Sequence, residues 1–161
     1  MKATKASPAV AAREGLEQGI IRDLLAFHVR RLSREIGRAY GEQIGDQKTR
    51  PGGFTALALI AANPGLSQTA LAREMGFDKA TIVALLDSLE AEGWAVRTRA
   101  SADRRRHSLA ITRAGEAALR RLRDAAVATE APMRAALTAA ELRQLIALLG
   151  RAHFGLSVRK G

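Results

Sequence analysis

The stretch from residue 66 to residue 112 limits the possible folds most, because it contains two short helical patterns joined by a tight turn. Ser67 and Asp78 precede these patterns as typical N-cap residues, and Gly76 suits the left-handed position that ends the first. The second pattern has apolar residues at i, i+3, i+4 and i+7, which lie on one face of a helix. These residues are Ile82, Leu85, Leu86 and Leu89. The stretch therefore predicts two consecutive helices, the second with one face in a core.

A β-hairpin is predicted directly after the second helix, with strands over residues 94–98 and 107–112. Between residues 97 and 106 there are five arginines and one acid, which give a local charge of +4. The arginines are Arg97, Arg99, Arg104, Arg105 and Arg106, and the acid is Asp103. A charge run is commonly a solvated surface, but an anion relieves the repulsion among consecutive arginines, which favours binding to phosphate or a DNA groove. The layout predicts a mainly α fold with a small two-stranded β-wing, a winged helix-turn-helix.

In such a unit the second helix keeps one face in the core while the other enters the major groove of DNA, which is about 12 Å wide. Lys79 and Thr81 can hydrogen-bond to base edges or phosphates, whereas Val83 and Ala84 offer only apolar contacts, for example with a thymine methyl. The first helix begins at residues 67–69, where free amides suit a backbone phosphate. The predicted DNA-binding residues are Ser67, Gln68, Thr69, Lys79, Ala80, Thr81, Val83, Ala84, Arg97, Arg99, Asp103, Arg104, Arg105 and Arg106.

Composition supports a polyanionic partner and argues against catalysis. The chain of 161 residues has 26 Lys and Arg against 16 Asp and Glu, a net charge of +10, which favours nucleic acid ahead of a membrane surface. Cysteine is absent, which excludes disulfides, thiolate nucleophiles and thiolate metal sites. The three histidines (His28, His107 and His153) are too scattered for a metal site, and the sequence has no Gly-rich phosphate loop. We therefore expect no enzyme activity, no metal and no cofactor.

Neither a membrane span nor a secretory signal is expected. The sequence has no run of about 18 apolar residues, and the N-terminal residues have no apolar segment of the kind that a signal peptide requires. A cytoplasmic protein is predicted.

The segments on either side of this unit are predicted to be helical. Residues 1–14 have no apolar period and are expected to be a disordered tail. Within residues 15–48 an apolar stripe predicts one helix of about 28 residues from Leu16. This helix would be either a buried core helix or a dimer-forming helix, and its length favours the second.

Residues 49–112 would form the DNA-binding domain, and residues 113–161 would complete the dimerisation region. A helix is expected to about Glu130, where Pro132 interrupts or kinks it. Thr138 and Glu141 match a capping box for the last helix, and the tail from Gly155 is expected to fray.

Three motifs resemble the MarR family of transcriptional regulators over about residues 16–154. Residues 89–97 (LEAEGWAVR) resemble its L-E-x-x-G-(apolar)-(apolar)-x-R signature, residues 103–105 its D-R-R, and residues 109–115 (LAITRAG) its L-T-x-x-G. The resemblance implies a dimeric, mainly helical protein that binds a palindromic operator and usually acts as a repressor. By position, Arg105 resembles the family's minor-groove arginine, and Asp103 would hold the wing arginines.

The chain departs from the family pattern in two places. Ile111 stands where leucine is usual, which is conservative. Val83 and Ala84 stand where polar residues commonly face bases. Few hydrogen bonds to base edges are therefore expected, and more of the DNA-binding energy is expected to come from the arginine wing.

Residues 50–54 (RPGGF) and 63–68 (NPGLSQ) look like a branch of this family that often responds to aromatic acids or their coenzyme A thioesters. The implied effector-binding residues are His28, Arg31, Arg34, Arg38, Tyr40 and Phe54. For His28 alone, a satisfied interface histidine is favoured over a ligand contact, and the arginines are equally read as a solvated face. The alternative function is a constitutive architectural DNA-binding protein without a small-molecule effector.

Overall fold

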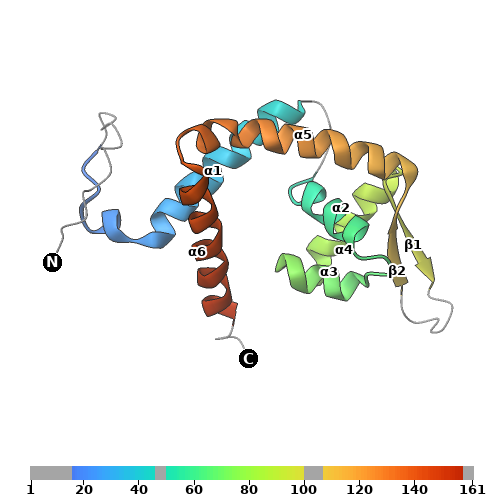
Figure 1. The fold of residues 1–161 in the computed structure, drawn as a ribbon. Coiled ribbons are helices and arrows are strands. Elements are labelled where there is room, and N and C mark those ends of the chain that lie inside the picture. The colour runs from blue at the N-terminus through green and yellow to red at the C-terminus, as the bar shows by residue number, and fades with distance from the viewer. Residues whose placement is uncertain (1–15, 46–49, 100–106, 158–161) are drawn as a thin grey trace. The chain divides into compact units, whose positions relative to one another are not determined.

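The computed structural model describes residues 16–45, 50–99 and 107–157 (Figure 1). The chain divides into two compact units, residues 1–35 and residues 36–161. The described elements are a 3₁₀ helix η1 (Gly19–Asp23), the helices α1 (Leu25–Ile44), α2 (Gly53–Ala62), α3 (Gln68–Met75) and α4 (Lys79–Ala91), the strands β1 (Ala95–Arg99) and β2 (His107–Ile111), and the helices α5 (Arg113–Ala135) and α6 (Ala139–Ser157). The predicted class, mainly α with a two-stranded wing, is confirmed.

The core lies around α2, which contacts α3, α5 and β2, while α4 contacts α3 and β1 (Figure 1). The sequence of α2 is apolar on nearly every side, and Leu57 is accordingly 0% exposed. The stripe predicted on α4 is buried in full, as are Leu71 of α3 and Leu122 of α5. Burial of each such leucine or isoleucine stabilises the fold by about 1.5–3 kcal/mol relative to an exposed side chain.

The two helices of the helix-turn-helix begin and end where their capping residues predict. The Ser67 hydroxyl oxygen accepts a hydrogen bond from the Ala70 N–H at 3.2 Å, and the Asp78 carboxylate accepts one from the Thr81 N–H at 2.7 Å. Gly76 has a φ of 65°, the left-handed conformation that ends α3. These caps satisfy amides that have no partner inside their helices, and so they define the short turn between α3 and α4.

The wing is an antiparallel pair in which Ala95 lies opposite Ile111 and Arg99 opposite His107. Its inner strand is also bonded to the segment before α3, because the Leu109 N–H donates to the Leu66 carbonyl at 2.8 Å. A single bridge between Ser67 and Ser108 extends this pairing. The hairpin is therefore attached to the start of α3 as well as to the end of α4.

The junction between the wing and α5 depends on Thr112 and Gly115. The Thr112 hydroxyl donates to the Gly93 carbonyl at 2.6 Å and accepts from the Gly115 N–H at 2.9 Å. A Cβ on Gly115 would lie 1.9 Å from the Trp94 carbonyl oxygen and 2.8 Å from Cγ1 of Ile111. Glycine is needed here because the first turn of α5 touches the backbone at the base of the hairpin.

Three predictions about helix limits are wrong, and two of them concern α1 and α5. The single helix expected from Leu16 is instead η1 followed by α1, because Gly19 has a φ of 49° and Leu24 is extended (ψ 113°), conformations that interrupt an α-helix. The helix expected to end near Glu130 continues to Ala135 through Pro132, whose carbonyl still accepts a hydrogen bond from the Ala136 N–H at 3.2 Å.

The tail expected to fray from Gly155 is helical through Ser157. The capping box at the other end of α6 is confirmed, since the Glu141 N–H donates to the Thr138 hydroxyl oxygen at 3.2 Å and Glu141 accepts from the Thr138 N–H at 2.8 Å. Residues 1–14, predicted to be a disordered tail, lie outside the described residues.

Gly115→Ala is predicted to lower the free energy of unfolding by about 1–3 kcal/mol or more, because the added methyl group must displace the Trp94 backbone. Ala114→Ser, on the exposed side of the same helical turn, is the control and should change it by no more than about 0.5 kcal/mol. Denaturant unfolding at equal protein concentration measures both. Equal stability of the two variants would contradict the close packing at this junction.

Candidate DNA interface

The outward face of α4 forms a shallow hollow that is largely open to solvent and is lined by Lys79, Ala80, Val83, Ala84 and Asp87. Four of these residues were predicted to enter the major groove, and the structure brings them together. Thr81, also predicted, is exposed outside this lining, and its N–H is used in the helix cap. Because the opposite stripe is buried, α4 has the two distinct faces that a recognition helix requires.

Asp78 completes the N-terminus of α4 as an ionised group. Hydrogen bonds from the backbone N–H and the hydroxyl of Thr81 lower the pKa of this exposed carboxyl below its ordinary value. Because the pKa is lowered in the folded state, the contribution of the cap is present above the ordinary aspartate pKa. It is lost only as the pH falls through the lowered value. The cap is therefore intact at neutral pH.

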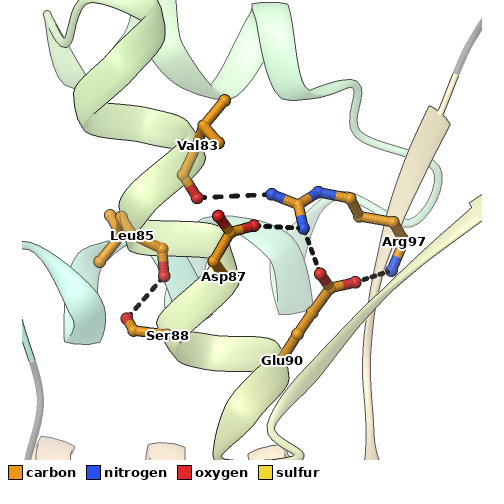
Figure 2. Close-up of polar contacts among 6 residues, drawn as sticks. All are labelled: Val83, Leu85, Asp87, Ser88, Glu90 and Arg97. Atoms are coloured by element: carbon orange, nitrogen blue, oxygen red, sulfur yellow. Dashed lines mark hydrogen bonds and ion pairs between the residues drawn. The ribbon is translucent and has the colours of Figure 1, made fainter.

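Arg97 of β1 is bound to α4 through several contacts (Figure 2). Its guanidinium pairs with the Glu90 carboxylate and lies 2.8 Å from Oδ1 of Asp87. Its backbone N–H donates to the second oxygen of Glu90 at 2.8 Å, and its Nη2 donates weakly to the Val83 carbonyl at 3.4 Å. The Arg97 side chain is 21% exposed, whereas that of Asp87 is 60% exposed. These contacts fix the first wing strand against the recognition helix.

Arg97 was predicted to contact DNA, and the structure directs its guanidinium to α4. A DNA contact by Arg97 stays a prediction. Sequence reasoning missed Glu90 and Asp87 as its partners. Their spacing of i and i+3 on one helix was visible, but the pairing with a strand seven and ten residues further on depends on how the hairpin folds back.

The first turn of α3 contains the predicted phosphate-binding residues. The Ser67 hydroxyl accepts a hydrogen bond from Ala70, and a serine that accepts one bond still has its proton to donate. Gln68 is half-buried and Thr69 is exposed. The structure thus places these residues at one helix N-terminus, beside the bridge to Ser108.

The tip of the wing lies outside the described residues, and with it the predicted residues Asp103, Arg104, Arg105 and Arg106. For Arg99 the structure describes only the backbone, as the last residue of β1. The roles of these residues stay predictions.

Tyr40 and Phe54, two of the predicted effector-binding residues, face each other with ring centroids 6.3 Å apart. The Tyr40 hydroxyl is buried and has no hydrogen-bond partner among the described residues. Burial also raises the pKa of this phenol above its ordinary value. A buried hydroxyl without a partner is costly, so a bound polar group would relieve this cost. Arg38, two residues before Tyr40, pairs with Glu42 at 2.6 Å.

The other predicted effector-binding residues lie in the unit of residues 1–35. Nε2 of His28 is 2.6 Å from the Arg22 carbonyl oxygen, which favours the alternative of a satisfied histidine. The Arg31 guanidinium lies 5.7 Å from the centre of the Phe27 ring, and Arg34 is exposed.

Within residues 16–45, 50–99 and 107–157, no cluster of three or more His, Asp or Glu side chains could hold a metal ion. None of the helices there combines the length and apolarity that crossing a bilayer requires.

Known proteins resemble this chain in sequence and in structure. The MarR family model matches residues 51–106. A protein of Thauera aromatica, whose name assigns it as a transcriptional regulatory protein for the hcr operon, is 36% identical over 154 residues, which are 95% of this chain and 93% of that protein.

Two solved structures of the transcriptional repressor CouR share the fold. The one bound to a 23-mer DNA duplex is 30% identical with a TM-score of 0.80, over 86% of this chain and 99% of that chain. The one bound to p-coumaroyl-CoA is 28% identical with a TM-score of 0.75, over 86% and 98% of the two chains.

Arg97→Met is predicted to lower the free energy of unfolding by about 1.5–3 kcal/mol, because the half-buried Glu90 carboxylate loses a charged hydrogen-bond donor and the exposed Asp87 loses its ion pair. Arg134→Met is the matched control, since it removes only an exposed ion pair with Glu130 and should cost less than about 0.5 kcal/mol. Chemical unfolding at low and high salt distinguishes the two variants. Salt should screen the exposed Arg134–Glu130 pair, so the loss of stability in Arg134→Met should diminish at high salt. Similar losses in both variants would contradict a structural role for Arg97.

Proposed function

Since this chain belongs to the MarR family of transcriptional regulators, we propose that it is a cytoplasmic, ligand-responsive repressor. In this proposal a homodimer binds a palindromic operator in double-stranded DNA and is released by a small aromatic acid or its coenzyme A thioester. The observation that carries the proposal is the outward face of α4, which is open to solvent while its inner stripe is buried. The family comprises regulators rather than enzymes.

DNA binding is supported by charge and by the geometry of α4. The net charge of +10 favours association with a polyanion, and most of the affinity would come from phosphate and minor-groove contacts. Four of the five residues proposed for the major groove line one hollow, and those proposed for the wing tip contain three consecutive arginines. A CouR structure that is 30% identical to this chain is bound to a DNA duplex.

Dimerisation is proposed through residues 15–48 and 113–161, because their helices expose large apolar side chains. In α1, Leu25 and Leu32 are 61% and 42% exposed, and in α6, Ile146 and Leu149 are 58% and 40% exposed. A second copy would remove such apolar surface from water. A two-fold dimer matches a palindromic operator when its recognition helices meet successive major grooves, about 34 Å apart.

An aromatic effector is proposed because Tyr40 offers a buried hydroxyl without a partner beside the Phe54 ring. A ligand with an aromatic ring and a polar group would stack on Phe54 and hydrogen-bond to Tyr40. Arg31, Arg34, Arg38 and His28 stay in the proposal as residues for the carboxylate or phosphates of the effector. The CouR structure bound to p-coumaroyl-CoA makes that thioester a suitable probe.

Arg105→Ala is predicted to weaken binding to an operator duplex by about 1–3 kcal/mol and to reduce the slope of log affinity against log salt by roughly one, because a minor-groove cation is lost. Fluorescence anisotropy with a duplex selected from a random pool measures both quantities. Arg134→Ala on α5 is the control and should leave affinity and slope unchanged. Unchanged values for Arg105→Ala would contradict the wing assignment.

p-Coumaroyl-CoA is predicted to lower operator affinity, and Tyr40→Phe to raise the thioester concentration needed by about two- to tenfold, the cost of one hydrogen bond. Coenzyme A alone is the ligand control. The thermal midpoint of Tyr40→Phe should not fall, since the hydroxyl has no partner in the described residues. If neither this thioester nor a panel of aromatic acids changes operator affinity, the protein is a constitutive architectural DNA binder instead.

A further inference from the structure

We infer that the outward face of α4 recognises the C5-methyl groups of thymines at two neighbouring A·T pairs in each operator half-site. This inference rests on the proposed function, because it assumes that α4 enters the major groove. It specifies thymine as the base that α4 contacts, and it assigns the specificity to Val83 with its neighbours Ala80 and Ala84.

The chemistry of the hollow selects the methyl group. Ala80, Val83 and Ala84 form the middle of its lining, and their side chains have neither hydrogen-bond donors nor acceptors. Of the groups that base pairs present in the major groove, the thymine methyl is the apolar one. A base edge pressed against this face without a methyl would lose water from its polar atoms and gain no hydrogen bond. The face therefore favours thymine over cytosine at the same position.

The polar residues at the two ends of the hollow do not change this selection. Asp87 could in principle accept a hydrogen bond from the cytosine amino group. However, its Oδ1 lies 2.8 Å from the Arg97 guanidinium, which also pairs with Glu90 and holds the Asp87 carboxylate toward the wing. Lys79, at the N-terminal end, is a flexible point charge that suits a phosphate. Among the residues of this lining, we therefore assign base selection to the apolar middle, while Thr81 lies outside the lining.

The spacing of the apolar residues indicates how many base pairs they cover. Residues three and four apart on a helix have Cβ atoms about 5–6 Å apart, so Ala80, Val83 and Ala84 form one contiguous patch. Base pairs follow one another every 3.4 Å or so along the duplex. The patch therefore spans about two successive pairs, and Val83, the largest of the three, is expected to make the most extensive methyl contact.

Replacing thymine by deoxyuridine tests the inference, because this change removes only the C5-methyl. The probe is a duplex selected from a random pool by the full-length chain, in which each thymine is replaced in turn. Burial of one methyl group contributes about 0.8 kcal/mol, so affinity should fall about fourfold at each contacted position. We expect such losses at neighbouring positions in both half-sites and no change at thymines elsewhere, which serve as internal controls.

Val83→Ala identifies the protein side of the contact. The quantity compared is the ratio of the affinities for the thymine duplex and the deoxyuridine duplex. In Val83→Ala this ratio should fall from about four toward one at one position in each half-site, while the other positions keep their wild-type ratios. Val96→Ala is the matched control, because it shortens an exposed valine of β1 that is neither a proposed DNA-binding residue nor part of the proposed dimerisation region, and it should leave every ratio unchanged. Each ratio compares two duplexes on the same protein, so a general change in affinity cancels.

The possible outcomes separate this inference from the proposed function. Tight, sequence-specific binding with no position sensitive to deoxyuridine would overturn the inference and leave the proposed function standing. Sensitivity that is the same in wild type and Val83→Ala would also overturn the assignment to Val83, since the methyl would then act through DNA shape. Failure to select any preferred duplex would overturn the proposed function, and the inference with it.

Discussion

The burial of one stripe of α4 is the constraint on which the rest of the structure depends. Ile82, Leu85, Leu86 and Leu89 are each no more than 2% exposed, so the rotation of the helix about its axis is determined. Only the opposite face is then available to a partner. Because burial of this stripe determines the orientation of α4, Asp87 and Glu90 are presented toward the wing. Arg97 pairs with both, which attaches the first strand of the hairpin to α4.

Local signals account for how much of the fold could be predicted. The caps at Ser67 and Asp78 and the left-handed Gly76 involve residues within a few positions of one another, so their patterns carry over directly into structure. The break between η1 and α1 was missed because the apolar residues continue in helical spacing across it. The helix end predicted near Pro132 is not found, because the last turn of α5 keeps its other hydrogen bonds.

The candidate interface was predictable to the extent that it follows from helical periodicity. The helical spacing of the sequence predicts Lys79, Ala80, Val83 and Ala84 on the outward face, and they line the same hollow. The partners of Arg97 were not predicted, because a contact between a strand and the preceding helix depends on the folding of the chain back on itself. The buried, unpartnered hydroxyl of Tyr40 also needed the structure, since no sequence pattern reports an unsatisfied group.

The attachment of the inner wing strand to two other segments has a mechanical consequence. Leu109 is bonded to Leu66 before α3, and Thr112 is bonded to Gly93 after α4. The base of the hairpin therefore cannot move away without breaking hydrogen bonds to the segment before α3 and to the segment after α4. In the proposed dimer, a change in the distance between the two α4 helices would therefore require the wing to move together with α3 and α4, because displacement of the wing alone would break these hydrogen bonds.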